Sequence, residues 1–233
     1  MKTSVVSFSD LFGHLLVNGT ETEKWKYVRY LTMTPEYAEM YPPDNEWAKC
    51  APVQDLAAID LRCNHEAQLF AHNTSTATVI AGEEIGFRIV RDFSPDLTIF
   101  HAGPGQVYLS KADDLSTYEG DGDWFKIASA GPINDTQWEL IGGIDMNFTI
   151  PLTTPPGTYL MRMEHIMPMD ARFSPQFYIS CAHINVVGPG GGNPTELARF
   201  PGSYKREDPG LLLNSQFEDL DKYVAPGPSV WKG

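Results

Sequence analysis

The longest uninterrupted strand signal in the chain is QFYISCAHINVV, residues Gln176–Val187. Aromatic and β-branched side chains follow one another along it, and such residues favour strands. The run ends at GPGGGNP, residues 188–194, which no regular element can contain. Just upstream, the turn residues PPG (155–157) lead into a second apolar run over residues 158–166. These two segments predict a pair of long strands near the end of the chain.

Shorter strand signals recur along the rest of the sequence, separated by turn residues. The 18 prolines, the 20 glycines and the near absence of helical periodicity predict an all-β fold, an antiparallel β-sandwich of the immunoglobulin or fibronectin kind with long loops. A long loop with one helical turn near residues 52–58 is predicted over 33–59. The further predicted strands cover residues 11–17, 25–31, 77–80, 85–90, 98–100, 107–110, 124–128, 138–141 and 147–150.

The chain has 233 residues and no internal repeat or low-complexity linker, which indicates one domain over residues 9–233. Its tail, residues 201–231, alternates Pro/Gly turns with apolar anchors and is expected to wrap the surface as extended chain. Residues 1–8 are interpreted as a truncated leader or a disordered N-terminus, because Ser9-Asp10 interrupts the apolar run and no small-residue cleavage site follows.

Composition excludes several partners. The formal net charge is −13, whereas nucleic acids and anionic membranes attract basic surfaces. No run of 18 apolar residues exists, so no membrane span is expected. Four N-glycosylation sequons favour a secreted protein, with a cytosolic chain carrying chance sequons as the alternative. They begin at Asn18, Asn73, Asn134 and Asn147. With three cysteines, Cys50, Cys63 and Cys181, the simplest secreted state has one disulfide and one thiol.

The best-placed candidate for chemistry is His101, which lies in the stretch IFHAGPGQVYL, residues 99–109. A Gly/Pro turn between two apolar runs presents its imidazole on a rigid corner, where a metal ligand or catalytic group is expected. The acid pairs Asp113/Asp114 and Asp121/Asp123 lie in turn-like sequence and are interpreted as solvated rather than as a glycosidase pair. GxSxG, P-loop and HExxH motifs are absent from the sequence.

Ten short motifs occur in one order along almost the whole chain, from Phe12 to Trp231. Together they resemble the fungal lytic polysaccharide monooxygenases of auxiliary-activity family nine. The motifs are LVNG (16–19), DLRCN (60–64), HAGP (101–104), VYLSKA (107–112), WFKI (124–127), PGTYLMR (156–162), QFY (176–178), FPGSY (200–204), DPG (208–210) and PGP (226–228).

The resemblance implies a secreted sandwich with one copper ion and oxidative cleavage of cellulose or related β-glucans, with cellulose or hemicellulose as the polysaccharide partner. It also implies an external electron donor and a monomer. Copper in the family is held by the amine and imidazole of an N-terminal histidine plus a second imidazole, with a tyrosine on the axial side. His101 matches the second histidine and Tyr178 the axial tyrosine. Gln176 matches a glutamine that assists oxygen chemistry, and Tyr223 matches a sugar-stacking tyrosine.

The resemblance further implies a disulfide between Cys63 and Cys181. Two positions depart from the family pattern. The N-terminal histidine falls near Ser9, where no histidine stands, and His14 could replace it only if processing exposed it as the first residue. Met169 stands at the position of a helper histidine, and a thioether cannot donate a proton.

Two functions therefore remain open from the sequence. One is a copper-dependent monooxygenase, and the other is a copper-free, inactive relative that binds a glycan or a partner.

Overall fold

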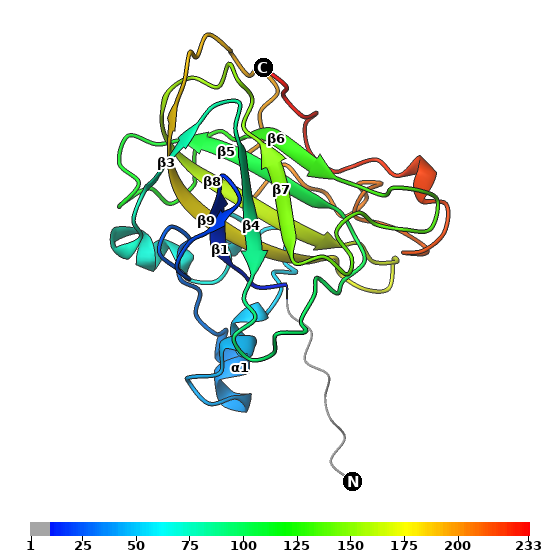
Figure 1. The fold of residues 1–233 in the computed structure, drawn as a ribbon. Coiled ribbons are helices and arrows are strands. Elements are labelled where there is room, and N and C mark those ends of the chain that lie inside the picture. Colours follow the sequence, from blue (N-terminus) through cyan, green and yellow to red (C-terminus); the bar gives the residue numbers. More distant parts are fainter. Residues whose placement is uncertain (1–9) are drawn as a thin grey trace.

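The computed structural model describes residues 10–233, in which two β-sheets pack face to face (Figure 1). The predicted leader and Ser9 lie outside the described residues. One sheet has the strand order β2-β1-β4-β7, with β1 Phe12–Val17, β2 Thr20–Glu21, β4 Glu84–Ile89 and β7 Asp145–Thr149. The other has the order β3-β9-β8-β5-β6, with β3 Ala77–Ile80, β9 Gln176–Val187, β8 Gly157–Met167, β5 Gly105–Lys111 and β6 Phe125–Ala130. The predicted sandwich is confirmed. Its pairings are antiparallel except for β3 with β9, which run parallel.

Three segments that are far apart in sequence share the side of β9 that faces away from β8. The strand β3 pairs with its last four residues, Val28 forms an isolated bridge to Ala182, and Val53 forms one to Phe177. The strand predicted over residues 25–31 is therefore wrong, since only a short stretch around buried Val28 pairs with the sheet. Covering the edge in pieces leaves no long row of unpaired backbone groups open to another chain.

The connection from β2 to β3 contains short helices that the loop prediction missed, and it includes α1, which projects from one end of the sandwich (Figure 1). The helical turn predicted near residues 52–58 is wrong, because this segment is irregular chain between the short helices Glu46–Cys50 and Ile59–Leu61. Thr34 caps α1 by accepting a hydrogen bond from the Tyr37 amide, and Pro35 occupies the first turn, where its missing N–H is no loss. The helices are α1 Pro35–Met40, η1 Glu46–Cys50, η2 Ile59–Leu61, η3 Ala67–Asn73 and, in the tail, η4 Leu220–Lys222.

Predicted strands over residues 98–100 and 138–141 are also wrong. Ile99 instead exchanges hydrogen bonds with Gly142 and Gly143, and Trp138 makes one isolated bridge to Pro132.

Both faces of the five-stranded sheet are buried. Its inner face packs on the other sheet through residues such as Val107, Met161 and Ala182. Its outer face, which includes Tyr108 and Phe177, packs on the β2–β3 connection and on residues 198–211 at the start of the tail. A strand buried on two sides needs apolar residues at consecutive positions, which explains the continuous apolar run of β9.

A disulfide joins Cys63 of the β2–β3 connection to Cys181 in the middle of β9. Both cysteines are buried, and the bond fastens the covering segment to the outer face of the sheet. Cys50 lies outside this disulfide and is also buried.

The tail packs on the outer face of the five-stranded sheet as irregular chain with turns and the short helix η4, not as the extended chain predicted from the sequence (Figure 1). Within the tail, Leu211 is fully buried, and Trp231 packs edge-on against Phe125 of β6. No helix among residues 10–233 is long and apolar enough to cross a membrane.

Candidate functional site

The turn that carries His101 is fixed against β8 just before β5 begins. The Ile166 amide donates a hydrogen bond to the Pro104 carbonyl, at 2.9 Å. A Cβ at Gly103 would lie 1.8 Å from the Ile166 carbonyl oxygen, so only glycine permits this approach. The sequence therefore folds into a tight corner that leaves the His101 side chain 16% exposed.

His101, Tyr178 and Gln176 meet at this corner. The rings of His101 and Tyr178 stack with centroids 4.5 Å apart and 19° between their planes. The Tyr178 hydroxyl lies 3.0 Å from His101 Nε2 and donates a hydrogen bond to Gln176 Oε1 at 2.6 Å. Burial, followed by the negative charge of Asp10, raises the pKa of Tyr178 well above its usual value, so the hydroxyl keeps its proton at neutral pH.

A buried carboxylate lies behind His101. Asp10 Oδ2 is 2.5 Å from His101 Nδ1 and 3.1 Å from His165 Nδ1, and Oδ1 accepts a hydrogen bond from the Phe100 amide at 3.0 Å. Burial alone would raise the pKa of Asp10. The charge of His165 and the hydrogen bonds from both histidines outweigh burial and hold that pKa below its usual range.

No role for Asp10 or His165 was predicted from the sequence. His165 of β8 is the register partner of Tyr178 on β9, so the two side chains share one face of the sheet. Pairing the two long predicted strands residue by residue was the signal that could have revealed His165. The position of Asp10 had no such signal, because it depends on how the chain enters β1.

Comparison with known proteins places the chain in a family. The model of Auxiliary Activity family 9, formerly GH61, matches residues 10–223. The chain belongs to this family.

Two curated relatives are lytic polysaccharide monooxygenases. Monooxygenase U of Thermothielavioides terrestris is 46% identical, over 96% of this chain and 92% of its own length. Monooxygenase C of Emericella nidulans is 39% identical, over 96% and 91%. Among solved structures, a cellulose-active polysaccharide monooxygenase from M. thermophila is 26% identical, with a TM-score of 0.71 over 96% of this chain and 99% of that one. CvAA9A is 25% identical, with a TM-score of 0.74 over 94% and 96%.

The donor groups at the corner suit one histidine ligand of a family copper site. Imidazole nitrogen is a ligand that copper favours, and His101 Nε2 is the ring nitrogen that lies beside the Tyr178 hydroxyl. Within residues 10–233, no group of three or more His, Cys, Asp or Glu side chains could hold a metal ion. The described residues therefore offer one imidazole, that of His101, with the Tyr178 phenol beside it. Ser9, near which the resemblance places the family's amino-terminal histidine, lies outside them.

His14 and Met169 lie in other surroundings. His14 is in the middle of β1, and its Nδ1 is 3.0 Å from the Thr22 carbonyl and 3.3 Å from Glu21 Oε1. It is therefore a strand residue held by β2 rather than a terminal ligand. The Met169 backbone forms an isolated parallel β-bridge with Leu212 of the tail, and its sulfur is 3.6 Å from Gln216 Nε2. The thioether is thus engaged by an amide.

Tyr223 is half-buried in a small apolar cluster with Ala102, Trp138 and Leu220. Its ring meets Trp138 edge-on at 4.9 Å, and its hydroxyl donates to the Gly210 carbonyl at 3.1 Å. Because Ala102 follows His101 directly, this cluster joins Tyr223 to the corner that carries the histidine.

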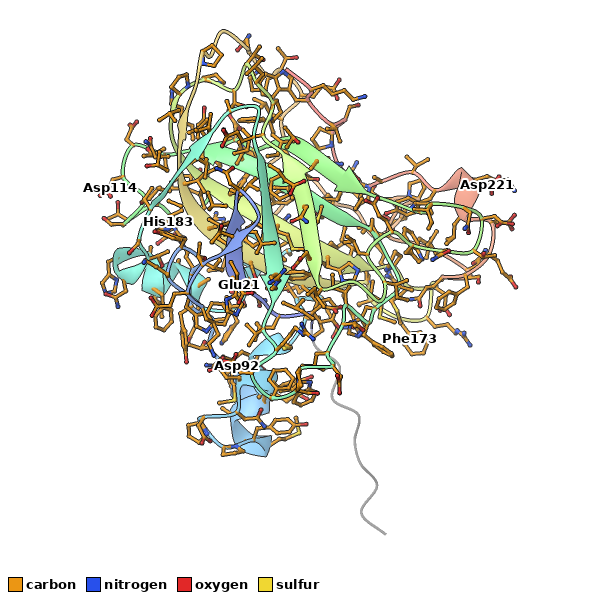
Figure 2. All side chains as sticks on the ribbon, viewed as in Figure 1. Glu21, Asp92, Asp114, Phe173, His183 and Asp221 are labelled. Atoms are coloured by element: carbon orange, nitrogen blue, oxygen red, sulfur yellow. A yellow bond between two sulfur atoms is a disulfide. The ribbon has the colours of Figure 1, made fainter. Side chains whose placement is uncertain are left out.

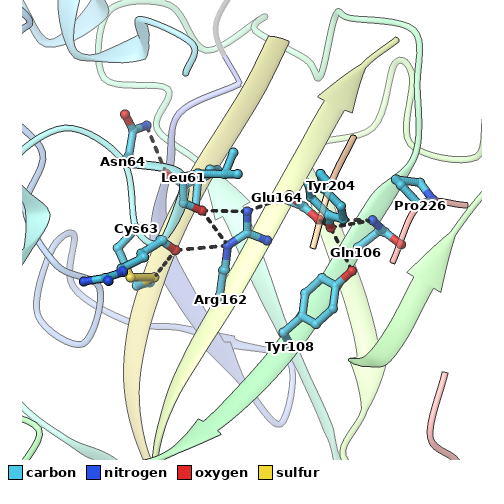
Figure 3. A network of polar contacts seen from close by, with 12 residues as sticks. Leu61, Cys63, Asn64, Gln106, Tyr108, Arg162, Glu164, Tyr204 and Pro226 are labelled. Carbon is cyan, nitrogen blue, oxygen red and sulfur yellow. Dashed lines mark hydrogen bonds and ion pairs between the residues drawn. A yellow bond between two sulfur atoms is a disulfide. The ribbon is translucent and has the colours of Figure 1, made fainter. Parts of the chain in front are cut away.

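A buried polar network supports the sheet beneath the tail (Figure 3). Arg162 and Glu164, both fully buried on β8, form an ion pair at 2.7 Å. Glu164 Oε1 also accepts hydrogen bonds from Gln106 Nε2, at 3.0 Å, and from the Tyr204 hydroxyl. Arg162 in turn donates to the Leu61 and Arg62 carbonyls, so the network ties β8 to the β2–β3 connection and to the tail.

A second buried pair lies further along β9, where Figure 2 labels His183. Arg29 Nε donates a hydrogen bond to His183 Nε2 at 2.8 Å, which requires that nitrogen to be unprotonated. Burial and the Arg29 charge lower the pKa of His183 to about 3. The histidine is therefore neutral in the folded chain at physiological pH.

Proposed function

We propose that the chain is a copper-dependent monooxygenase that oxidatively cleaves cellulose or a related β-glucan. The observation that carries this proposal is the stack of His101 on Tyr178, with the Tyr178 hydroxyl between His101 Nε2 and Gln176 Oε1. Three residues from two distant segments meet at one corner, and they are the three that the resemblance implies for the family site. Membership of the family and the 46% identity to a named polysaccharide monooxygenase support the same assignment.

Each residue has a separate task in this proposal. His101 would hold the metal through Nε2, and Tyr178 would stand beside it with a hydroxyl whose raised pKa keeps it protonated. Gln176 fixes the direction of that hydroxyl. Copper, when bound, supplies the one-electron chemistry that activates oxygen, with electrons from an external donor.

The substrate surface in this proposal runs from the His101 corner toward Tyr223. Tyr223 is partly exposed and packs edge-on against Trp138, which suits a residue that stacks on a sugar. A net charge of −13 disfavours nucleic acids and anionic membranes and leaves a neutral polysaccharide acceptable.

The test is a copper titration of the full-length mature protein, followed by calorimetry and paramagnetic resonance. We expect one tetragonal copper site in the wild type, loss of that site in His101→Ala, and no change in His65→Ala, whose ring pairs with Asp60. Unchanged binding by His101→Ala would refute the ligand assignment. Absence of binding by correctly processed wild type would refute copper dependence.

The second candidate function is a copper-free relative with a glycan- or partner-binding face, and Met169 favours it. The position of the helper histidine holds a thioether engaged by Gln216, which cannot deliver a proton as an imidazole can. This candidate predicts that the protein sediments with cellulose and releases no oxidised product when copper and a reductant are supplied. Oxidised products from the same mixture would reject it.

The setting of this function is extracellular, and the protein acts as a monomer whose single domain covers residues 9–233. All four sequon asparagines are exposed, as glycosylation requires, namely Asn18, Asn73, Asn134 and Asn147. A buried disulfide also suits an oxidising compartment. Mass spectrometry of the secreted protein before and after glycosidase treatment tests both the glycans and the mature N-terminus.

A further inference from the structure

We propose that Asp10 is a positioning residue for the site: its carboxylate holds His101 by Nδ1 and thereby makes Nε2 the ring nitrogen that takes a ligand. The identity of that ligand as copper rests on the proposed function. The contacts among Asp10, His101 and His165 are present in the structure and do not depend on which ligand binds.

The first support is burial. Asp10 is 2% exposed, and burying an isolated carboxylate is strongly unfavourable unless donors compensate it. It receives three donors, the Phe100 amide and the Nδ1 atoms of His101 and His165. The carboxylate is therefore tied to the residue before His101 and to His101 itself, so it fixes both the backbone and the ring of the corner.

The second support is hydrogen accounting. An ionised carboxylate oxygen only accepts, so the two nitrogens that contact Oδ2 must both carry hydrogen. In His101 the carboxylate occupies Nδ1, so Nε2 is the ring nitrogen that remains for a ligand. This Nε2 lies 3.0 Å from the Tyr178 hydroxyl. A carboxylate behind a metal-binding histidine fixes the ring orientation and raises ligand basicity, and loss of such a partner typically lowers metal affinity by about 10–100-fold.

The two histidines on Asp10 differ in access. The side chain of His101 is partly exposed, whereas that of His165 is fully buried against Phe12 and Tyr178. Among the described residues, His165 Nε2 has no hydrogen-bond partner. His165 therefore shares and steadies the carboxylate from inside the sandwich, and only His101 can present Nε2 at the surface.

The chain offers a matched control. In the β2–β3 connection, away from the site, His65 Nδ1 lies 3.1 Å from Asp60 Oδ2. This is also a contact between a histidine Nδ1 and a carboxylate. Asp60→Asn changes the same chemical group without touching Asp10, His101 or His165.

The decisive readout is the tautomer of His101 in the metal-free, nitrogen-15-labelled protein, measured by long-range proton–nitrogen correlation. We expect hydrogen on Nδ1 in the wild type and in Asp60→Asn. A wild-type His101 that lacks hydrogen on Nδ1 would overturn the proposal without any variant. In Asp10→Asn, we expect a mixture of the two tautomers, and an unchanged His101 spectrum would also overturn it.

The second readout is affinity for Cu²⁺ by calorimetry. We expect Asp10→Asn to bind 10–100-fold more weakly than the wild type, with Asp60→Asn unchanged. Equal affinities of Asp10→Asn and wild type would show that Asp10 is only structural. A protein that keeps Nδ1–H on His101 but binds no copper would support the positioning role and reject the proposed function, so the two failures are distinguishable.

Discussion

Replacing Glu164 with Gln tests the buried network of Figure 3 most sharply. Glu164 and Arg162 are both fully buried, with Oε2 and Nη2 2.7 Å apart. Glutamine keeps the shape and retains one oxygen for Gln106 and Tyr204. However, it removes the negative charge and turns an amide NH₂ toward the guanidinium.

The magnitude follows from the Arg162 charge that remains. Breaking a buried ion pair by removing one partner costs about 3–5 kcal/mol, because the other charge stays buried without compensation. Domains are stable by about 5–15 kcal/mol in total, so Glu164→Gln is expected to remove roughly a fifth or more of that stability. For a chain of this length, the loss corresponds to a fall in Tm of roughly 6–20 °C.

The assay is urea unfolding followed by both tryptophan fluorescence and circular dichroism. We expect a lower midpoint with an unchanged slope, since the native fold persists. The matched control is Asp123→Asn, which breaks an exposed pair with Arg199 and is expected to change stability by less than about 1 kcal/mol. A double variant, Arg162→Met with Glu164→Gln, should lose less than the sum of the single variants, because no unpaired charge then remains. A loss below about 1 kcal/mol in Glu164→Gln would refute the reasoning.

Three further predictions concern the disulfide, His183 and Tyr178. The Cys63→Ala/Cys181→Ala variant opens a loop closed over 118 residues and is expected to lose up to about 5 kcal/mol by denaturant unfolding, whereas an unchanged midpoint would contradict it. The pKa of His183 is about 3 in the folded chain and about 6.5 in the unfolded one, so the unfolded chain holds the extra proton. Its part of the stability is present above pH 6.5 and is lost as pH falls toward 3, by about 1.4 kcal/mol per pH unit, and His183→Gln should flatten that part of the pH–stability curve. Tyr178→Phe keeps the ring stack but removes the hydroxyl beside His101 Nε2. We expect a loss of about 0.5–1.5 kcal/mol by urea unfolding together with a changed copper resonance spectrum, and an unaltered spectrum would place Tyr178 away from the metal.

Much of the sandwich could be predicted from local patterns. The long strand signals at residues 158–166 and Gln176–Val187 correspond to β8 and β9, because period and residue type are local properties of a strand. Residues 25–31 show the same alternation but form only one bridge, since the edge of β9 that they reach is shared with β3 and Val53. Local pattern alone carries no information on which segment occupies a shared edge.

The site divides in the same way. His101, Tyr178 and Gln176 could be named because motifs surround each of them, and the spacing of two residues put Gln176 and Tyr178 on one face of a strand. Asp10 and His165 belong to no such motif, and their meeting depends on strand register and on the path of the chain into β1. Those are tertiary properties that a single sequence does not encode locally.

Oxidised product release from cellulose measures the central claim most directly. The copper-loaded, correctly processed protein is incubated with amorphous cellulose and a reductant, and soluble oligosaccharides are analysed by mass spectrometry. We predict oxidised cello-oligosaccharides from the wild type and from Asp60→Asn, and none above background from His101→Ala. Equal product from His101→Ala, or no product from the copper-loaded wild type, would contradict the account.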